Sequence, residues 1–300
     1  MRRRRYVQML GFSGSLSIVG CIGDRTTATD SEPPMKTLTL ATATTVHDSG
    51  LLDELTPGFE DLFGVTLKAV VQGTGAALRT ARDGDCDIVL VHARPLENEF
   101  IHAGYGINRR RLMVNDFMII GPPDDPAGVA GRSPSAAFRA IAETETLFLS
   151  RGDRSGTHIR ERRLWREAGV VPSGEWYRET GQGMGSTLVT AEQIGAYTLI
   201  DRGTFLSVST DGTLVQHIAR GIEGPPPLLR NEYAVIPVNP ARNEGAYALA
   251  MAFVGSLTGP GQAAIEEFHV NGERVFRPTA MSLDPDFEQY VPTDWPEWNT

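Results

Sequence analysis

The fold is decided by one stretch of sequence, Phe148-Leu149-Ser150-Arg151-Gly152-Asp153-Arg154-Ser155-Gly156-Thr157-His158. Its first residues are β-prone, and the residues after it carry apolar side chains at helical spacing until Gly169 ends the run. This pattern predicts a strand, a tight loop and a helix that begins near Ser155. The first backbone N–H groups of a helix lack intrahelical acceptors and carry the positive end of its dipole, so they can bind an oxyanion. The predicted oxyanion-binding residues of this stretch are Arg151, Ser155, Gly156 and Thr157.

Two further segments place hydroxyl side chains where a strand runs into a helix. The strand expected over residues 37–42 leads into one of them, just before a helix that Pro57 is expected to kink. The other is Gln72-Gly73-Thr74-Gly75, whose glycines let a ligand approach the backbone closely. Each segment alone could be only a helix cap or a turn, but three such segments in one α/β chain favour an anion site. The predicted ligand residues here are Thr44, Thr45 and Thr74, with Gly73 as a possible lining residue.

Strand-like runs alternate with helical stretches, which predicts an α/β fold with largely parallel sheets. The runs are residues 37–42, 66–71, 88–91, 117–120, 147–149 and 234–238. Ligands of such folds bind beyond the carboxyl ends of strands, where all three hydroxyl segments fall. Residues 121–126 and 224–227 are rich in proline and glycine, and we interpret them as the segments where the chain leaves one lobe and returns to it. They predict lobe one from residues 37–120 plus 234–300 and lobe two from residues 121–233.

The N-terminus has the features of an export signal. Four arginines precede an apolar run over residues 9–20, which is shorter than the roughly 20 residues that a membrane span needs. Arg3-Arg4-Arg5-Tyr6-Val7 resembles a twin-arginine signal, and Ile18-Val19-Gly20-Cys21 resembles a lipobox in which Cys21 becomes lipidated. A plain basic N-terminus with an incidental cysteine is the alternative. Residues 1–21 are therefore predicted to be an export signal with a lipobox, and residues 22–36 a flexible tether.

Composition limits the classes of function. The chain has 300 residues and is 41% hydrophobic, which suits one two-lobed protein with a substantial core. Only Cys86 remains after processing at Cys21, so an intrachain disulfide is not possible, and no Cys/His spacing predicts a metal site. Removing residues 1–20 deletes four arginines and no acid, which takes the formal net charge from −9 to −13. An anion must then be attracted by the site itself, and no nucleic-acid partner is expected.

The basic residues are almost all arginine, since Lys36 and Lys68 are the two lysines of the sequence. Together with the acidic balance, this composition suggests a salt-adapted source. A GC-rich genome could favour arginine over lysine by itself.

Several other groups of residues could suggest a cofactor site or a catalytic site, but the sequence does not support one. Gly181-Gln182-Gly183 matches G-x-G, but it lacks the preceding strand and the acidic residue about 20 positions on that a dinucleotide site needs. The sequence contains no G-x-S-x-G motif, the nucleophile elbow that would indicate a hydrolase. His47 and His158 stand beside proposed sites and are interpreted as surface or supporting residues, and the run Arg109-Arg110-Arg111 as a solvated basic turn. The residues interpreted as a possible cleft lining are Met184, Gly185, Ser186 and Thr187.

Longer motifs follow one another in a fixed order between residues 37 and 240. They are T-T-x-x-D-S-G-L-L-D at 44–53, Val91-His92-Ala93, Gly104-Tyr105-Gly106, Met113-Val114-Asn115-Asp116-Phe117, S-R-G-D-x-S-G-T-H at 150–158, G-x-G-M-G-x-T-L at 181–188, and residues 196–204. This set resembles the tungstate-binding proteins of ABC importers, within the type II periplasmic binding-protein class. The S-G-T with a preceding arginine also resembles phosphate-binding proteins of that class. One departure is Thr42-Ala43-Thr44-Thr45, where the family has a T-T-T-S run.

The resemblance implies a two-lobed type II periplasmic-binding-protein fold with a ligand cleft between the lobes. It implies a solute-binding lipoprotein, without catalytic activity or cofactor, that captures a tetrahedral oxyanion and delivers it to an ABC permease with its ATPase. We expect a monomer, exported by a twin-arginine route and anchored by lipid at the extracellular face of the membrane.

The resemblance favours tungstate as the oxyanion, and the sequence does not separate tungstate from molybdate. Phosphate is the next candidate, because Asp153 could accept a phosphate proton. An extracellular phosphoryl-transferring enzyme or a sensor domain is the alternative from another class, and it would need His47 or His158 as a general base.

Overall fold

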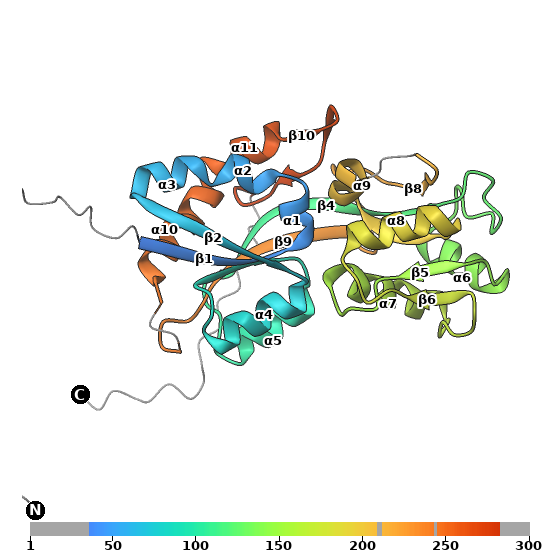
Figure 1. The fold of residues 1–300 in the computed structure, drawn as a ribbon, viewed down its shortest axis with the longest axis horizontal. Helices are drawn as coiled ribbons and strands as arrows, with labels where there is room; N and C mark the ends of the chain where they lie inside the picture. Colours follow the sequence, from blue (N-terminus) through green and yellow to red (C-terminus); the bar gives the residue numbers. More distant parts are fainter. Residues whose placement is uncertain (1–35, 209–211, 243–244, 283–300) are drawn as a thin grey trace, which may run out of the picture. The chain divides into compact units, whose positions relative to one another are not determined.

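The structure is a computed structural model that describes residues 36–208, 212–242 and 245–282 (Figure 1). Its strands are β1 (Lys36–Ala43), β2 (Val65–Gln72), β3 (Ile88–Val91), β4 (Arg110–Gly121), β5 (Phe148–Ser150), β6 (Tyr177–Glu179), β7 (Thr198–Asp201), β8 (Val215–Ile218), β9 (Arg230–Pro237), β10 (His269–Val270), β11 (Glu273–Arg274) and β12 (Arg277–Pro278). Its helices are α1 (Thr44–Asp48), α2 (Leu51–Leu55), α3 (Pro57–Phe63), α4 (Thr74–Asp83), α5 (Arg94–His102), α6 (Pro134–Glu143), α7 (Gly156–Ala168), α8 (Met184–Ile194), α9 (Arg202–Val208), α10 (Tyr247–Thr258) and α11 (Gly261–Glu267).

The sheets are mixed, which corrects the expectation of largely parallel sheets. Strand β1 pairs in parallel with β2 and β3, and β5 pairs in parallel with β6. Strand β4 is antiparallel to β7, β8, β9 and β12, and β3 is antiparallel to β9. Antiparallel pairing follows from the path of the chain, because β4 carries it out of the β1–β3 sheet and β9 brings it back (Figure 1).

Two packing regions share the long strand β4. Met113 packs in a cluster with residues of β1, β3 and α10, whereas Phe117 packs in a cluster with residues of α6, α7 and β7. The same change occurs on the return path, where Leu229 belongs to the Phe117 cluster and Tyr233 to the Met113 cluster. Between the two regions, β4 and β9 bury polar side chains instead of apolar ones. These buried polar residues are Asn115, Asp116 and Asn231.

A buried ion pair fixes the chain where β4 passes between the two packing regions. Asp116 accepts hydrogen bonds from Arg202 Nε (2.7 Å) and Nη2 (3.2 Å). Its Oδ2 atom also accepts the backbone N–H groups of Arg220 (3.2 Å) and Gly221 (2.9 Å). Four donors thus satisfy this buried carboxylate, which offsets the cost of taking it out of water.

The prediction for the deciding stretch is confirmed. Strand β5 ends at Ser150, and α7 begins at Gly156 with Ser155 as its N-cap, whose side chain accepts the N–H of His158 (3.3 Å). Gly169 ends the helix in the left-handed conformation (φ 74°). Gly152 also has a positive φ of 65°, and a Cβ there would lie 2.6 Å from Glu179 Cβ, so the loop requires glycine at this position.

Two local predictions need correction. Pro57 does not kink a continuous helix but occupies the first position of a separate helix, α3. The run at residues 109–111 is not a solvated turn. Arg109 is fully buried and donates to Glu97 (2.8 Å) and Glu232 (3.3 Å), and the next two arginines begin β4, seven residues before the predicted strand.

The predicted export signal and lipobox at residues 1–21, and the tether apart from Lys36, lie outside the described residues. Within the described residues, no single helix has the length and apolar character to cross a membrane. The bent pair α10 and α11 passes that test together, by length and composition only, and α10 packs Phe253 and Leu257 into the core.

Candidate oxyanion site

Helices α4 and α7 bring two of the predicted segments together, because their N-termini face each other. A Cβ at Gly73, the N-cap of α4, would lie 3.5 Å from Ser155 Cβ and 3.7 Å from Asp153 Oδ2. The side chains that follow these caps, Thr74 and Thr157, are 0% and 1% exposed. Both helices have more than two turns, so each directs its first N–H groups and the positive end of its dipole toward the other.

Arg151 lies at the end of β5 and is 3% exposed. It pairs with Asp153, whose other oxygen accepts the Ser155 N–H (3.0 Å). Burial alone would raise the pKa of Asp153, but the Arg151 charge and the hydrogen bonds from Ser155 lower it below its ordinary value. Asp153 is therefore ionised and holds Arg151 in place, and each of its oxygens accepts a hydrogen bond.

A hydrogen-bonded chain leads from His92, at the end of β3, to Thr45 of α1. His92 Nδ1 lies 2.8 Å from Asn231 Oδ1, Asn231 Nδ2 donates to the Tyr233 hydroxyl (2.9 Å), and that hydroxyl lies 2.9 Å from Thr45 Oγ1. An amide oxygen can only accept, so His92 Nδ1 carries a hydrogen and donates it. The Tyr233 oxygen already accepts from Asn231, and its own hydrogen is available to Thr45. The Thr45 hydrogen is then available to a ligand.

Burial keeps this chain uncharged. Desolvation lowers the pKa of His92 to about 4, against the hydrogen bond with Asn231 that raises it, and the charges of Arg151 and Arg160 lower it further. Burial also raises the pKa of the Tyr233 hydroxyl well above its ordinary value. His92 is therefore a neutral imidazole and Tyr233 a neutral phenol at physiological pH.

His92 also contacts the N-terminus of α7 directly. A Cβ at Gly156 would lie 2.5 Å from His92 Cε1, so only glycine lets the first residue of α7 approach the ring this closely. The His92 ring stacks on Tyr233 with 4.9 Å between ring centroids. The ends of β1, β2, β3 and β5 are therefore joined through direct contacts around one buried region.

Several buried polar atoms of this region have no hydrogen-bond partner among the described residues. They are Thr74 Oγ1, Thr157 Oγ1, Arg151 Nε and the Asn115 side-chain amide, and Asn115 lies beside the Tyr233 hydroxyl. An unpaired buried polar group costs about 1–3 kcal/mol, so proteins rarely keep several together without a ligand to pair them. Except for the Asn115 oxygen, each of these groups can donate a hydrogen bond.

The remaining predicted residues lie at the start of α1 and in α8, and their environments differ from that of the buried donors. Thr44 is half-buried at the start of α1. In α8, Met184 packs in a hydrophobic cluster with Leu188, Ser186 is exposed, and the Thr187 hydroxyl donates to Gly183 O (3.0 Å) and bonds Thr180 Oγ1 (2.9 Å). Gly185, also half-buried, would place a Cβ 3.6 Å from the Val208 side chain.

The two histidines beside the predicted site differ in burial, since the side chain of His158 is only 13% exposed. The side chain of His47 is 55% exposed and pairs with Asp48 (3.4 Å). His158 Nδ1 accepts the Arg154 N–H (3.0 Å), which makes it a support for the loop before α7. Burial lowers the pKa of His158 below its ordinary value, against the charge of Glu179 that raises it.

Asn231 and Tyr233 were not predicted as site residues, and Asn115 appeared only within the motif Met113 to Phe117, which matches the family pattern but could equally hold structural caps or an interlobe pair. A signal was present, since Asn115 interrupts the apolar run Leu112 to Ile120 at a position that should face a core. A polar residue in a buried strand needs a partner, and that requirement points to a site.

The mixed sheets, the two packing regions on β4 and β9, and the donor-rich strand ends define a class of two-lobed solute-binding proteins. A protein-family model described as "PBP superfamily domain" matches residues 27–258. A Haloferax volcanii protein named "Putative ABC transporter anion-binding protein" is 48% identical over 98% of this chain and 91% of its own length. The tungstate-binding protein TupA of Peptoclostridium acidaminophilum is 40% identical over 78% of this chain and 82% of its own length.

Solved structures agree with these relatives. The tungstate ABC transporter structure from Geobacter sulfurreducens has a TM-score of 0.70 and 41% identity, covering 77% of this chain and 98% of that one. The tungstate-binding protein TupA from Desulfovibrio alaskensis has a TM-score of 0.67 and 40% identity, covering 81% and 98%. The chain belongs to the PBP superfamily and, within it, to the family of TupA tungstate-binding proteins and ABC-transporter anion-binding proteins. It is thus an extracytoplasmic binding protein and not an enzyme.

Proposed function

We propose that this chain captures tungstate, or the molybdate dianion of nearly equal size, in the buried region between α4 and α7. It then delivers the anion to an ABC permease. The observation that carries the proposal is the set of buried donors, on Thr74, Thr157 and Arg151, that have no partner among residues 36–208, 212–242 and 245–282. The N-termini of α4 and α7 add backbone N–H groups and their dipoles. Arg151 supplies the formal positive charge, through a charge-assisted hydrogen bond to the dianion.

The donor inventory favours a fully deprotonated oxyanion over phosphate. Tungstate and molybdate carry no proton near neutral pH and accept hydrogen bonds at every oxygen, whereas hydrogen phosphate must also donate one. Asp153 accepts hydrogen bonds from Arg151 and the Ser155 N–H, and among the buried atoms of this site that lack a partner in the described residues, only Asn115 Oδ1 is purely an acceptor, against several donors. A phosphate O–H that faces Arg151 Nε or a backbone N–H would remain unpaired, which costs about 1–3 kcal/mol.

Calorimetry on the mature protein tests this proposal, with tungstate, molybdate, sulfate and phosphate titrated separately at pH 8. We expect one tungstate or molybdate per chain, and phosphate at tenfold excess should not displace tungstate. Binding of phosphate as tight as that of tungstate would contradict the donor argument. An absence of heat and of thermal stabilisation with all four anions would contradict the proposed function itself.

We also propose that binding closes the lobes, taken as residues 37–120 plus 234–300 and residues 121–233. The proposed ligand contacts are divided between Thr45 and Thr74 on one side and Arg151 and Thr157 on the other, so a bound anion favours the closed arrangement by bridging them. Small-angle scattering should then show compaction when tungstate is added.

For export, we propose a twin-arginine route followed by lipidation of Cys21, based on the sequence of residues 3–7 and 18–21. Cys21→Ser should release the protein from the membrane fraction, and equal retention of the variant would contradict the lipobox. The acidic composition with two lysines supports the further proposal of a salt-adapted source.

A further inference from the structure

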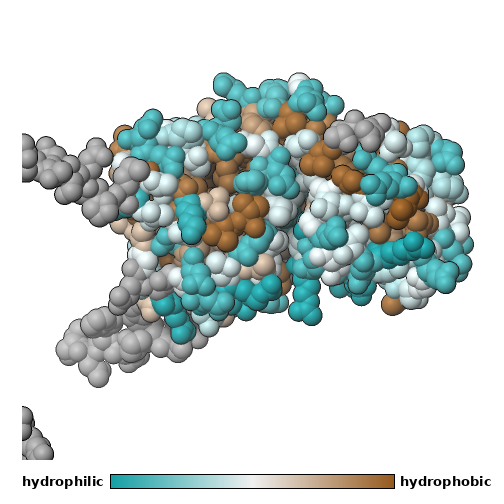
Figure 2. Space-filling view, in the orientation of Figure 1, coloured by the Kyte–Doolittle hydropathy of each residue, from teal (hydrophilic) through white to brown (hydrophobic). Residues whose placement is uncertain are grey.

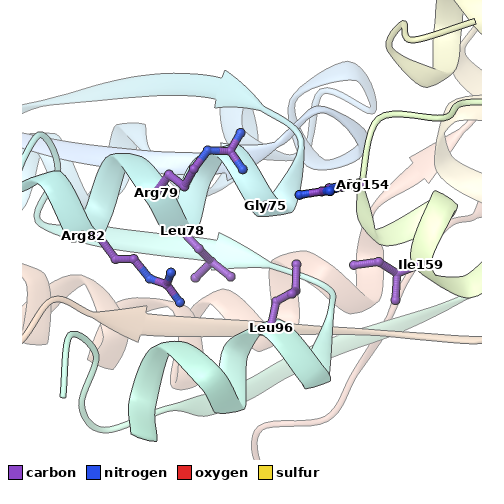
Figure 3. A pocket seen from close by; sticks show the side chains of 7 residues that line it. All are labelled: Gly75, Leu78, Arg79, Arg82, Leu96, Arg154 and Ile159. Atoms are coloured by element: carbon purple, nitrogen blue, oxygen red, sulfur yellow. The ribbon is translucent and has the colours of Figure 1, made fainter. Parts of the chain in front are cut away.

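A groove beside the candidate site is lined by arginines from α4 and from the start of α7. Its volume is ≈ 210 Å³, and it contains Arg79 and Arg82 of α4 and Arg154 of the loop before α7. Figure 3 shows these guanidinium groups around an apolar floor formed by Leu78, Leu96 and Ile159. Gly75, directly after Thr74, forms part of the wall, so the groove adjoins the N-terminus of α4.

A second groove lies on the other side of Ile159, which lines both. Its volume is ≈ 380 Å³, and its lining includes His92 and Gly156 of the candidate site together with Arg94, Arg160, Arg163 and Arg166. Arg160 and Arg163 are three residues apart on α7, as Arg79 and Arg82 are on α4, so each pair presents its charges on one helix face. No aspartate or glutamate is among the residues that line either groove.

Four of these arginines carry charge that no acidic partner compensates, and we call them the arginine rim: Arg79, Arg82, Arg154 and Arg163. All four are exposed, and none forms an ion pair in the described part of the chain. The charge of Arg163 acts on one neighbouring group, Arg160. The pKa of Arg160 falls to about 10, first through burial and then through repulsion from Arg163.

The arginine rim opposes the charge of the molecule as a whole. The chain carries a formal net charge of −9, which by itself repels a dianion. Cations concentrated at a groove raise the local concentration of anions and can raise association rates about 10- to 1,000-fold at low ionic strength. This positive surface adjoins the proposed site at both helix N-termini, so an anion drawn to it arrives where the buried donors lie.

We propose that the arginine rim is an approach path that accelerates the capture of oxyanion dianions by this acidic protein when the ionic strength is low. The inference rests on the proposed function. Because the rim lies outside the buried donors, it acts on the rate of association and not on retention of the bound anion. Its effect depends on ionic strength, since about 1 M salt shortens the Debye length to about 3 Å and screens exposed charges.

Stopped-flow fluorescence with tungstate tests the approach path, because Trp165 on α7 lies in the helix that begins at the candidate site. We compare the wild-type protein with the triple variant Arg79→Gln, Arg82→Gln, Arg163→Gln at 20 mM and 1 M salt. At 20 mM salt, the association rate constant of the variant should fall at least about tenfold while its dissociation rate constant stays within about twofold. At 1 M salt, the two proteins should associate at similar rates.

A matched control separates local charge from total charge. The control variant also loses three positive charges, but from exposed residues that line neither groove: Lys68→Gln, Arg132→Gln and Arg178→Gln. This control should associate with tungstate at the wild-type rate within about twofold. Equal association rates in both triple variants, or a change confined to dissociation, would overturn the approach path while leaving tungstate binding intact. A wild-type protein that binds no oxyanion would overturn the proposed function first.

Discussion

The N-termini of α7 and α8 look alike in sequence and differ in what their hydroxyl groups do. Both follow a glycine-rich loop and carry a threonine near the helix start, Thr157 in α7 and Thr187 in α8. The Thr157 hydroxyl is buried and has no partner in the part of the chain that the structure describes, whereas the Thr187 hydroxyl is paired with Gly183 O and Thr180. A hydroxyl at a helix start therefore indicates a ligand only when the fold leaves it unpaired.

The surroundings of the two helix starts differ in the same way. Near α7, Arg151 supplies positive charge and Gly156 allows close contact with His92. At α8, the first residue, Met184, is fully buried in a hydrophobic cluster. The first residue of α8 therefore packs against apolar side chains. Figure 2 shows apolar surface in the region of this helix, where Val189 and Ile194 are 40% exposed.

The largest expected effect comes from Arg151→Ala, which removes the formal charge beside α7. Truncating one partner of a buried charged hydrogen bond costs about 2–5 kcal/mol, so tungstate affinity should fall at least about 30-fold. Calorimetry gives the affinity and circular dichroism checks that the fold is retained. Wild-type affinity in a folded variant would remove Arg151 from the site.

A matched pair of substitutions tests the comparison itself. Thr157→Val removes a hydrogen bond to a charged ligand, worth about 1.5–3 kcal/mol, so affinity should fall at least about tenfold with little loss of stability. Thr187→Val breaks two internal hydrogen bonds and should lower the free energy of unfolding by about 1 kcal/mol while affinity stays unchanged. Calorimetry and urea unfolding measure the two quantities, and the reverse assignment of effects would contradict our account of both helices.

A smaller effect is expected from Tyr233→Phe, which interrupts the hydrogen-bonded chain between His92 and Thr45. The Thr45 hydroxyl would no longer be oriented toward the ligand, at a cost of about 0.5–1.5 kcal/mol in binding. Calorimetric titration of the wild-type protein and the variant with tungstate measures this difference. Equal affinities of the two proteins would exclude a contribution from the chain.

The smallest expected effect is a change with pH in the contribution of Glu161, on α7, to the stability of the protein. Burial raises the pKa of Glu161 to about 7, although it accepts hydrogen bonds from Ser150, Tyr177 and Trp165. The folded protein therefore keeps this proton over a range, from about pH 4.5 to 7, in which the unfolded chain loses it. The contribution of Glu161 to stability is then greatest at low pH and declines as the pH rises through that range.

Melting temperatures between pH 5 and pH 8 measure this effect, with Glu161→Gln as the variant that cannot titrate. The wild-type protein should lose more stability than the variant as the pH rises. Parallel curves would show that Glu161 is ionised in the folded protein throughout.

Much of the fold and the helix starts of the candidate site could be predicted from the sequence because they depend on local patterns. Strand β3 was predicted at its observed residues, and the N-cap Ser155 and the C-terminal Gly169 of α7 follow from capping chemistry. The antiparallel pairing of β4 and β9 could not be predicted, because it depends on contacts more than 100 residues apart, such as Val114 with Glu232. Asn231 and Tyr233 were missed for the same reason, since their partners His92 and Thr45 are distant in sequence.

A crystal structure with tungstate, with anomalous scattering recorded at a tungsten absorption edge, tests the central claim most directly. We predict one strong anomalous peak between the N-termini of α4 and α7, within hydrogen-bond distance of Thr157 Oγ1 and the Arg151 guanidinium. A single peak at the start of α8, or peaks confined to the arginine rim, would contradict the assignment of the buried donors as the oxyanion site.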